Sequence, residues 1–306
     1  MINLHIEMLR FTKILIETNL FIAFAAVAFL WSTILLLDFQ SAHFILLSLQ
    51  VFFSTWFVYQ ISRWIYFKKG MYTNKDELVV QWFEKYPKLN EFTIYASGIL
   101  AVVLMFFLQW KTIIVLCVVG LISVLYPVPF LKPFGITTRL RDVPFVKLFL
   151  ISFVWSATSV VLPALEANIN LHERRDVWIL FVAQFIFILF ITLPFDINDE
   201  ASDKASNVKT IPVFFGVKVS KVICLVLGIV YSFIMLFLFA LINWNHSPNK
   251  YLPEATIILI WVLLILLQVF TFYKSASAKK WIIKVVYDGS MLVYFLIMYF
   301  TIALFH

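Results

Sequence analysis

Residues 176–204 read DVWILFVAQFIFILFITLPFDINDEASDK. The first part of this stretch is an apolar run of about 20 residues, which is long enough to cross a bilayer as one helix. Three aspartates, Asp196, Asp199 and Asp203, follow at the end of that run. The stretch therefore predicts a membrane-spanning helix that carries a group of acidic side chains at its C-terminal end.

The composition extends this interpretation to the whole chain. Of the 306 residues, 63% are hydrophobic and only 13% are charged, and the mean hydropathy is +0.96. A soluble domain carries about 25% charged residues, so this chain could not cover a water-exposed surface. The composition excludes a soluble protein and predicts an all-α integral membrane protein.

Eight further apolar runs are long enough to span, which makes nine in all. The third and fourth are divided only by Trp110-Lys111 and therefore predict a tight hairpin. The nine runs lie at 14–37, 43–67, 91–110, 112–131, 143–165, 176–198, 218–243, 254–273 and 281–305.

The positions of lysine and arginine predict the orientation of these spans. With the N-terminus inside, all but four of the 24 basic residues fall on the inner side, and an inner excess of basic residues is the usual pattern. The exceptions are Lys111, Arg174, Arg175 and Lys250. We expect an integral protein of the cytoplasmic membrane, if bacterial, with its N-terminus inside and its C-terminus outside. The net charge of +7 then suits anionic inner-leaflet lipid rather than nucleic acid.

The three aspartates stand at i, i+3 and i+7, so on a helix they share one face. A helix C-terminus is the negative end of the macrodipole, so acidic groups there need a compensating cation. A hard divalent ion such as Mg²⁺ fits, because it accepts one or two carboxylates and completes its shell with water and phosphate oxygens. The spacing leaves one alternative open, a solvated helix end balanced by Lys204 and Lys209.

Three segments in chain order resemble the UbiA superfamily of intramembrane prenyltransferases, as does the number of spans. The segments are Tyr126-Pro127-Val-Pro-Phe-Leu-Lys132, then Pro144-Phe-Val-Lys147, and then Asp196-Ile-Asn-Asp199-Glu-Ala-Ser-Asp203-Lys204 followed by Lys209-Thr-Ile-Pro212. The resemblance implies a single domain over residues 1–306. It also implies nine helices that form two four-helix halves plus a ninth helix around a central cavity.

In that family the acidic motif after the sixth span binds Mg²⁺, which holds an isoprenyl diphosphate whose chain passes to an aromatic or lipid acceptor. The resemblance implies that Asp199 and Asp203 are the principal metal ligands and that Asp196 assists them. It further implies that the diphosphate contacts Lys147, Lys209, Tyr126 and Lys132.

The chain departs from the family at the inner end of the second span. The family carries an aspartate-rich motif there, but residues 59–67 read YQISRWIYF and contain no carboxylate. Gln60 and Arg63 occupy acidic positions of the motif, and we assign both to diphosphate binding. One Mg²⁺ ion is then expected rather than two.

Three interpretations of Arg63 remain open. Its guanidinium could extend to the interface from a helix C-terminus. It could hold the diphosphate as a bidentate clamp in place of a metal ion, or pair directly with Asp199 or Asp203 and close the site to Mg²⁺.

Two functions follow from these alternatives. The first is a prenyltransferase at the inner membrane face, with Asp199, Asp203 and Arg63 as its catalytic residues. The second is a lipid-binding membrane protein of this fold that is non-catalytic or of altered chemistry, in which Arg63 replaces the first metal site. Glu17, Asn19 and Asp288 also lie at inner ends of spans and are further candidates for the site.

Overall fold

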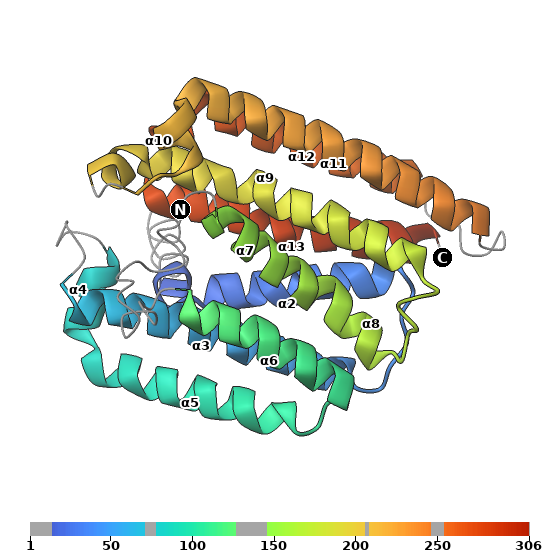
Figure 1. The fold of residues 1–306 in the computed structure, drawn as a ribbon, viewed down its shortest axis with the longest axis horizontal. Coiled ribbons are helices and arrows are strands. Elements are labelled where there is room, and N and C mark those ends of the chain that lie inside the picture. The colour runs from blue at the N-terminus through green and yellow to red at the C-terminus, as the bar shows by residue number, and fades with distance from the viewer. Residues whose placement is uncertain (1–13, 71–77, 127–145, 206–207, 246–253, 306) are drawn as a thin grey trace, which may run out of the picture.

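The computed structural model describes residues 14–70, 78–126, 146–205, 208–245 and 254–305, and every regular element in these ranges is a helix (Figure 1). The helices are α2 (Leu20–Leu36), α3 (Phe44–Lys68), α4 (Leu78–Lys85), α5 (Pro87–Met105), α6 (Trp110–Leu125), α7 (Val146–Ser156), η3 (Ala157–Val161), α8 (Leu162–Glu166), α9 (Arg175–Ala205), α10 (Ile211–Phe215), α11 (Val217–Asn245), α12 (Glu254–Tyr273) and α13 (Lys280–Phe305).

Seven helical segments in the described ranges are long and apolar enough to cross a membrane, and α7, η3 and α8 together form one of them. Two further apolar helices, α2 and α6, are shorter, with 17 and 16 residues. They coincide with the first and fourth predicted runs. The all-helical membrane class is thus confirmed, whereas the count of nine spans, their orientation and the two-halves arrangement remain predictions.

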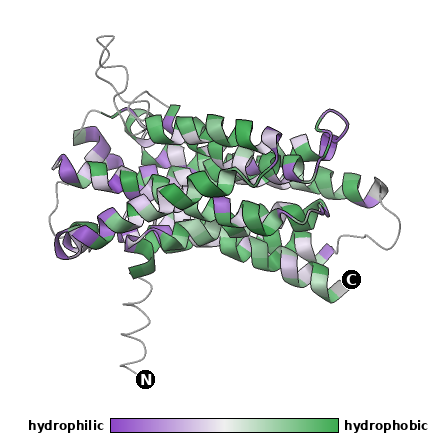
Figure 2. Ribbon diagram, turned by 90° about the horizontal axis from the view of Figure 1, so that it is seen from below, coloured by the Kyte–Doolittle hydropathy of each residue, from purple (hydrophilic) through white to green (hydrophobic). Residues whose placement is uncertain are grey.

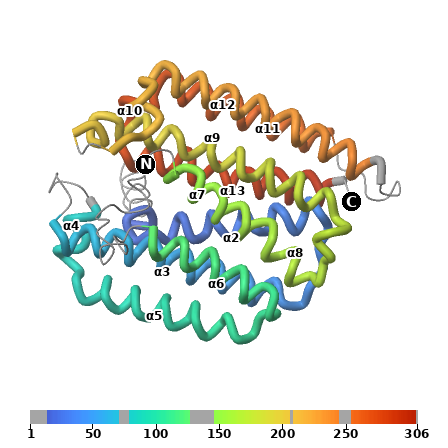
Figure 3. The backbone as a smooth tube through the Cα atoms, in the orientation of Figure 1, coloured from blue at the N-terminus to red at the C-terminus, as the bar shows by residue number. Residues whose placement is uncertain are grey.

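The long helices lie side by side along the molecule (Figures 1 and 3). Helix α2 packs between α3 and α13, and α9 packs between α7 and α11. Hydrophobic residues cover the length of the bundle and hydrophilic ones gather toward its ends (Figure 2). Helices α4 and α10 lie at one end, which we call the α10 end, and α8 lies toward the other (Figure 3).

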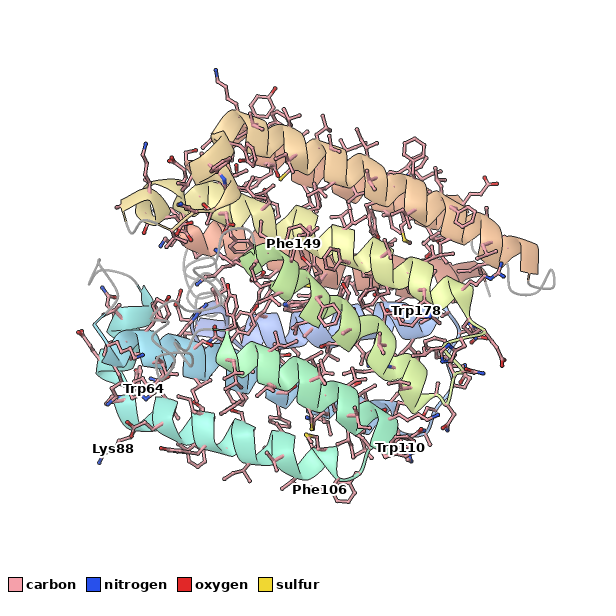
Figure 4. The ribbon with its side chains drawn as sticks, viewed as in Figure 1. Trp64, Lys88, Phe106, Trp110, Phe149 and Trp178 are labelled. Carbon is pink, nitrogen blue, oxygen red and sulfur yellow. The ribbon has the colours of Figure 1, made fainter. Side chains whose placement is uncertain are left out.

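Aromatic side chains lie near both ends, as expected where a bilayer meets water. Trp64 and Lys88 lie at the α10 end, and Trp110 and Trp178 lie toward the other (Figure 4). Phe106 is 78% exposed on the side of the bundle, where lipid would cover it.

Aromatic packing fills the region where α2, α9, α11 and α13 meet. The Phe187 ring of α9 lies 5.6 Å from Phe29, 5.3 Å from Tyr231 and 5.6 Å from Tyr294, measured between ring centroids. These four side chains are almost fully buried. This side of the bundle is therefore a packed core, and α9 is held in it through the middle of its length.

A π-helical turn interrupts the fifth predicted span at Ala157–Val161. Pro163 explains its position, because proline lacks the N–H for an i−4 bond and its ring collides with the carbonyl of Ser159. Ser159 turns its hydroxyl to the Trp155 carbonyl at 2.8 Å and also bonds Gln184 of α9. The π-helical turn is thus hydrogen-bonded both to the preceding turn of α7 and to α9.

A buried glutamate joins three segments at the end opposite α10. The Glu166 carboxylate accepts hydrogen bonds from Thr112 Oγ1 at 2.7 Å and from the Gln109 backbone N–H at 3.3 Å, and His43 Nδ1 lies 3.1 Å from it. Glu166 is 1% exposed. The carboxylate therefore connects α8 to the residues at the starts of α3 and α6.

We expect Glu166→Ala to lower the free energy of unfolding by about 3 kcal/mol, because it leaves the buried Thr112 hydroxyl and the partly buried Gln109 N–H without their charged acceptor. Denaturant unfolding in detergent micelles would measure this. Glu173→Ala, in the exposed part of the following loop, is the control and should change stability by less than about 0.5 kcal/mol. Equal stability of the two variants would contradict the role given to Glu166.

Candidate functional site

The aspartates of the opening stretch lie on α9 itself, which continues seven residues past the predicted end of its apolar run. Pro194 lies inside this helix, and Asp196, Asp199 and Asp203 follow it. All three side chains therefore project from one helix at the α10 end. Their environments differ, because Asp196 is 1% exposed while Asp199 and Asp203 are only partly buried.

Asp196 is paired with Lys147, at the start of α7. The ammonium group donates a hydrogen bond to Asp196 Oδ1, and their side chains are 20% and 2% exposed. Lys147 also interacts electrostatically with Tyr126 and Asp203. The structure thus brings together four residues that the sequence resemblance assigned to the site, from the ends of α6, α7 and α9.

Asp199 and Asp203 form the more accessible part of this acidic face. Lys280 of α13 lies 3.3 Å from Asp199 Oδ1. Asp203 Oδ2 and the neighbouring Thr210 hydroxyl are buried, and neither makes a hydrogen bond of normal geometry within the described residues, although the two side chains interact with each other. A buried carboxylate oxygen without a partner is costly, so this atom is suited to bind a ligand from outside the chain.

Asn198 holds the acidic part of α9 against the next pair of helices. Its amide Nδ2 donates to the carbonyl of Ser275 at 2.8 Å and to that of Ala278 at 3.0 Å, both between α12 and α13. Sequence reasoning did not single out Asn198 or Lys280. Nothing in the residues around Lys280 connects it to the acidic motif, because the contact depends on how α13 packs.

Arg63 lies near the end of α3 and contacts neither Asp199 nor Asp203 among the described residues. Its Nη1 donates to the carbonyls of Ile16 and Glu17, each at 3.3 Å, and lies 3.6 Å from Glu17 Oε2. The direct Arg63–aspartate pair considered from sequence is therefore not formed. Glu17 is the carboxylate that Arg63 meets.

The other assigned residues are distributed around these groups. Gln60 is buried, and its Oε1 accepts from Asn19 Nδ2 at 3.3 Å. Lys209 is exposed after α9. Lys132 lies outside the described residues. The assignments of Gln60, Lys209 and Lys132 to diphosphate binding thus remain predictions.

The donor atoms on α9 fit a hard divalent cation. Among the described residues no group of three or more His, Cys, Asp or Glu could hold a metal ion. Magnesium, however, is commonly held by one or two carboxylates together with the phosphates of its substrate. Asp199 and Asp203 supply two carboxylates, one with an unpartnered buried oxygen. Asp196 has its Oδ1 bonded to Lys147 instead.

An apolar cavity of about 750 Å³ lies between α3, α5, α6 and α7. Tyr59, Ser62 and Tyr126 line it toward the α10 end, and Gln50 lines it on α3 in the other direction. Residues 50–62 of α3 cover about 18 Å at the helical rise per residue. Tyr126 interacts electrostatically with Lys147, so the cavity and the paired charges share a border.

The profile of the UbiA prenyltransferase family matches residues 92–302. No curated protein sequence matches the chain. Among solved structures, a UbiA homologue from Aeropyrum pernix K1 is similar with a TM-score of 0.67 at 12% identity, over 92% of this chain and 97% of that one. These matches confirm the resemblance predicted from the sequence motifs.

Two further solved structures are similar in fold. One is a UbiA homologue from Archaeoglobus fulgidus bound to DMAPP and Mg²⁺, with a TM-score of 0.61 at 14% identity over 96% of this chain and 98% of that one. The other, from work on digeranylgeranylglyceryl phosphate synthase, has a TM-score of 0.57 at 18% identity over 95% of this chain and 99% of that one.

We expect Lys147→Met to destabilise the protein by about 3–5 kcal/mol, because it leaves the buried Asp196 carboxylate without its counter-charge. Adding Asp196→Asn should restore most of this loss, since the remaining side chain is then neutral. Unfolding of the two single variants and the double variant in detergent would measure the coupling. A double variant no more stable than Lys147→Met would contradict the pairing.

Proposed function

We propose that this chain, which belongs to the UbiA prenyltransferase family, transfers an isoprenyl chain from its diphosphate to an aromatic or lipid acceptor at the inner membrane face. The observation that carries the proposal is the unpartnered Asp203 carboxylate oxygen beside the Lys147–Asp196 pair. It offers an anionic ligand position next to a cation and at the border of an apolar cavity.

Asp199 and Asp203 would hold one Mg²⁺ ion. When bound, Mg²⁺ supplies neutralisation of the charge that gathers on the diphosphate as it leaves. The fold is similar to that of the Archaeoglobus fulgidus homologue solved with DMAPP and Mg²⁺, which supports this choice of ligand. Lys280 neutralises part of the carboxylate charge through its contact with Asp199.

Lys147 would contact the diphosphate on its α7 side. Its bond to the nearly fully buried Asp196 fixes where the ammonium lies. A fixed positive charge in a poorly hydrated place stabilises an anion more than a mobile one in water does, since nothing must reorganise as the charge develops. Asp196 is then a positioning residue that acts through Lys147.

The cavity would hold the isoprenyl chain. The bond between the allylic carbon and the diphosphate oxygen breaks, and its electron pair leaves with the diphosphate. The acceptor then bonds to the allylic carbon and loses a proton. Tyr59, Tyr126 and Trp155 line the cavity, and aromatic faces attract a cation while excluding the water that would capture it.

We expect Asp199→Asn and Asp203→Asn each to lower the rate of prenyl transfer by about 100-fold or more, because each removes a carboxylate from the metal site. Transfer should also stop in EDTA and return with Mg²⁺. Glu200→Gln on the same helix is the matched control and should transfer at the normal rate. Full activity in both folded aspartate variants would refute the proposed function.

If the cavity holds the isoprenyl chain, the rate of transfer should depend on the length of that chain, and the residue at position 120 should set the limit. This residue lines the cavity on α6, and a Cβ placed on it meets no atom within 4 Å. We expect Gly120→Phe to reduce transfer from the longest accepted donor by about tenfold or more, and from dimethylallyl diphosphate much less, because its ring occupies part of the cavity.

Val118→Phe is the control for this experiment. Val118 lies on the same helix but is 49% exposed, and we expect its replacement to leave the donor preference unchanged. Donors of one to four isoprene units would be compared with one acceptor. An equal effect of Gly120→Phe on all donors would show that the chain lies elsewhere.

A further inference from the structure

Four charged side chains from three elements meet beside the end of α3. Glu17 Oε2 lies 3.6 Å from Arg63 Nη1, and Glu17 Oε1 lies 4.0 Å from Lys284 Nζ. Asp288 interacts electrostatically with both Lys284 and Arg63. The four form a balanced set of two cations and two carboxylates, which we call the Arg63 cluster. All four side chains are largely removed from solvent.

Among the described residues, the guanidinium of Arg63 is hydrogen-bonded through one of its nitrogens, Nη1. Nη1 donates to the carbonyls of Ile16 and Glu17, which are the last two residues of a helical turn at residues 14–17. Within the part of the chain that the structure describes, Nε and Nη2 make no hydrogen bond. These two atoms form one of the forks with which arginine binds a phosphate in bidentate fashion.

The face of α13 connects this cluster to the acidic part of α9. Lys280, Lys284 and Asp288 are spaced by four residues, so they follow one another along one face of α13. Lys280 contacts Asp199, and Lys284 contacts Glu17. Successive residues of this row are about 6 Å apart along the helix axis. Arg63 and the α9 aspartates therefore border one polar region.

A metal ion does not fit the α3 side of this region. Among the described residues, Arg63 and Lys284 balance Glu17 and Asp288, so this set has no excess of carboxylates with which to hold a divalent cation. An anion does fit, because it can replace Glu17 as the partner of both cations. The free fork of Arg63 supplies the donors that a diphosphate would use.

We propose that Arg63 and Lys284 form a cationic half of the diphosphate site supplied by the protein itself, so that the chain needs one metal ion, on the α9 side. Glu17 is the internal counter-ion that the diphosphate displaces, and its backbone carbonyl with that of Ile16 orients Arg63. This inference rests on the proposed function, because it concerns the same leaving group.

Binding of inorganic pyrophosphate in EDTA tests the inference without any prenyl transfer. We expect the purified wild-type protein to bind pyrophosphate, measured by isothermal titration calorimetry. Arg63→Gln should weaken this binding by tenfold or more, and Arg63→Lys by less, since it keeps the charge but loses the fork. Lys69→Gln, at the exposed end of the same helix, is the matched control and should bind as the wild type does.

Glu17→Gln gives a test of opposite sign. It removes the counter-ion but keeps the backbone carbonyls that hold Arg63, so pyrophosphate should bind several-fold more tightly. A merely structural role of the cluster would weaken binding in this variant. If Arg63→Gln fails to fold, Lys284→Gln replaces it and should also weaken binding. Unchanged pyrophosphate affinity in the folded cation variants would overturn the inference.

A second measurement counts the metal ions bound to each chain. With a non-hydrolysable isoprenyl diphosphate analogue, we expect one Mn²⁺ per chain by electron paramagnetic resonance, lost in Asp203→Asn and retained in Arg63→Gln. Two ions per chain would overturn the inference even if transfer is normal.

Pyrophosphate binding that depends on Arg63 in a protein without transferase activity would instead refute only the proposed function. Binding of the isoprenyl diphosphate analogue without binding of free pyrophosphate would also overturn the inference, because the inference makes the diphosphate the recognised group.

Discussion

A charged side chain in a membrane interior is stable only when an opposite charge or a hydrogen-bonding group lies next to it. At the candidate site, the Lys147–Asp196 pair meets this requirement. Asp196 is 1% exposed on a helix otherwise packed by aromatic rings. Its counter-charge comes from α7, so the pair fixes α7 against α9 near the α10 end. The remaining carboxylates extend from that fixed point toward the solvent, where a ligand can reach them.

The same constraint explains why the two ends of the bundle differ. At the end near α8, the Glu166 carboxylate is hydrogen-bonded by groups from two other segments. These contacts have a structural role. At the α10 end, Asp203 Oδ2 has no partner among the described residues. A ligand that binds there would complete this atom, which is the reason for proposing the site at the α10 end.

Much of this could be predicted from the sequence, because hydrophobic run length and aspartate spacing are local signals. The run at 176–198 and the spacing of Asp196, Asp199 and Asp203 placed all three on one helix, as found. Partners were not predictable, since they depend on packing between distant helices. Arg63 meets Glu17 rather than the aspartates, and Lys280 reaches Asp199 from α13.

The cavity also lies where the sequence could not place it. Phe29, Phe187 and Tyr294 fill the space between α2, α9 and α13, and the described cavity lies between α3, α5, α6 and α7. The central position of the cavity in the predicted arrangement remains a prediction. Because α3 carries Tyr59 on the cavity and Arg63 one turn later in the charge cluster, this one helix relates the apolar and the charged parts of the site. In the proposed reaction, the absence of carboxylates at the end of α3 would therefore alter how the diphosphate is bound without altering how the cavity holds the isoprenyl chain.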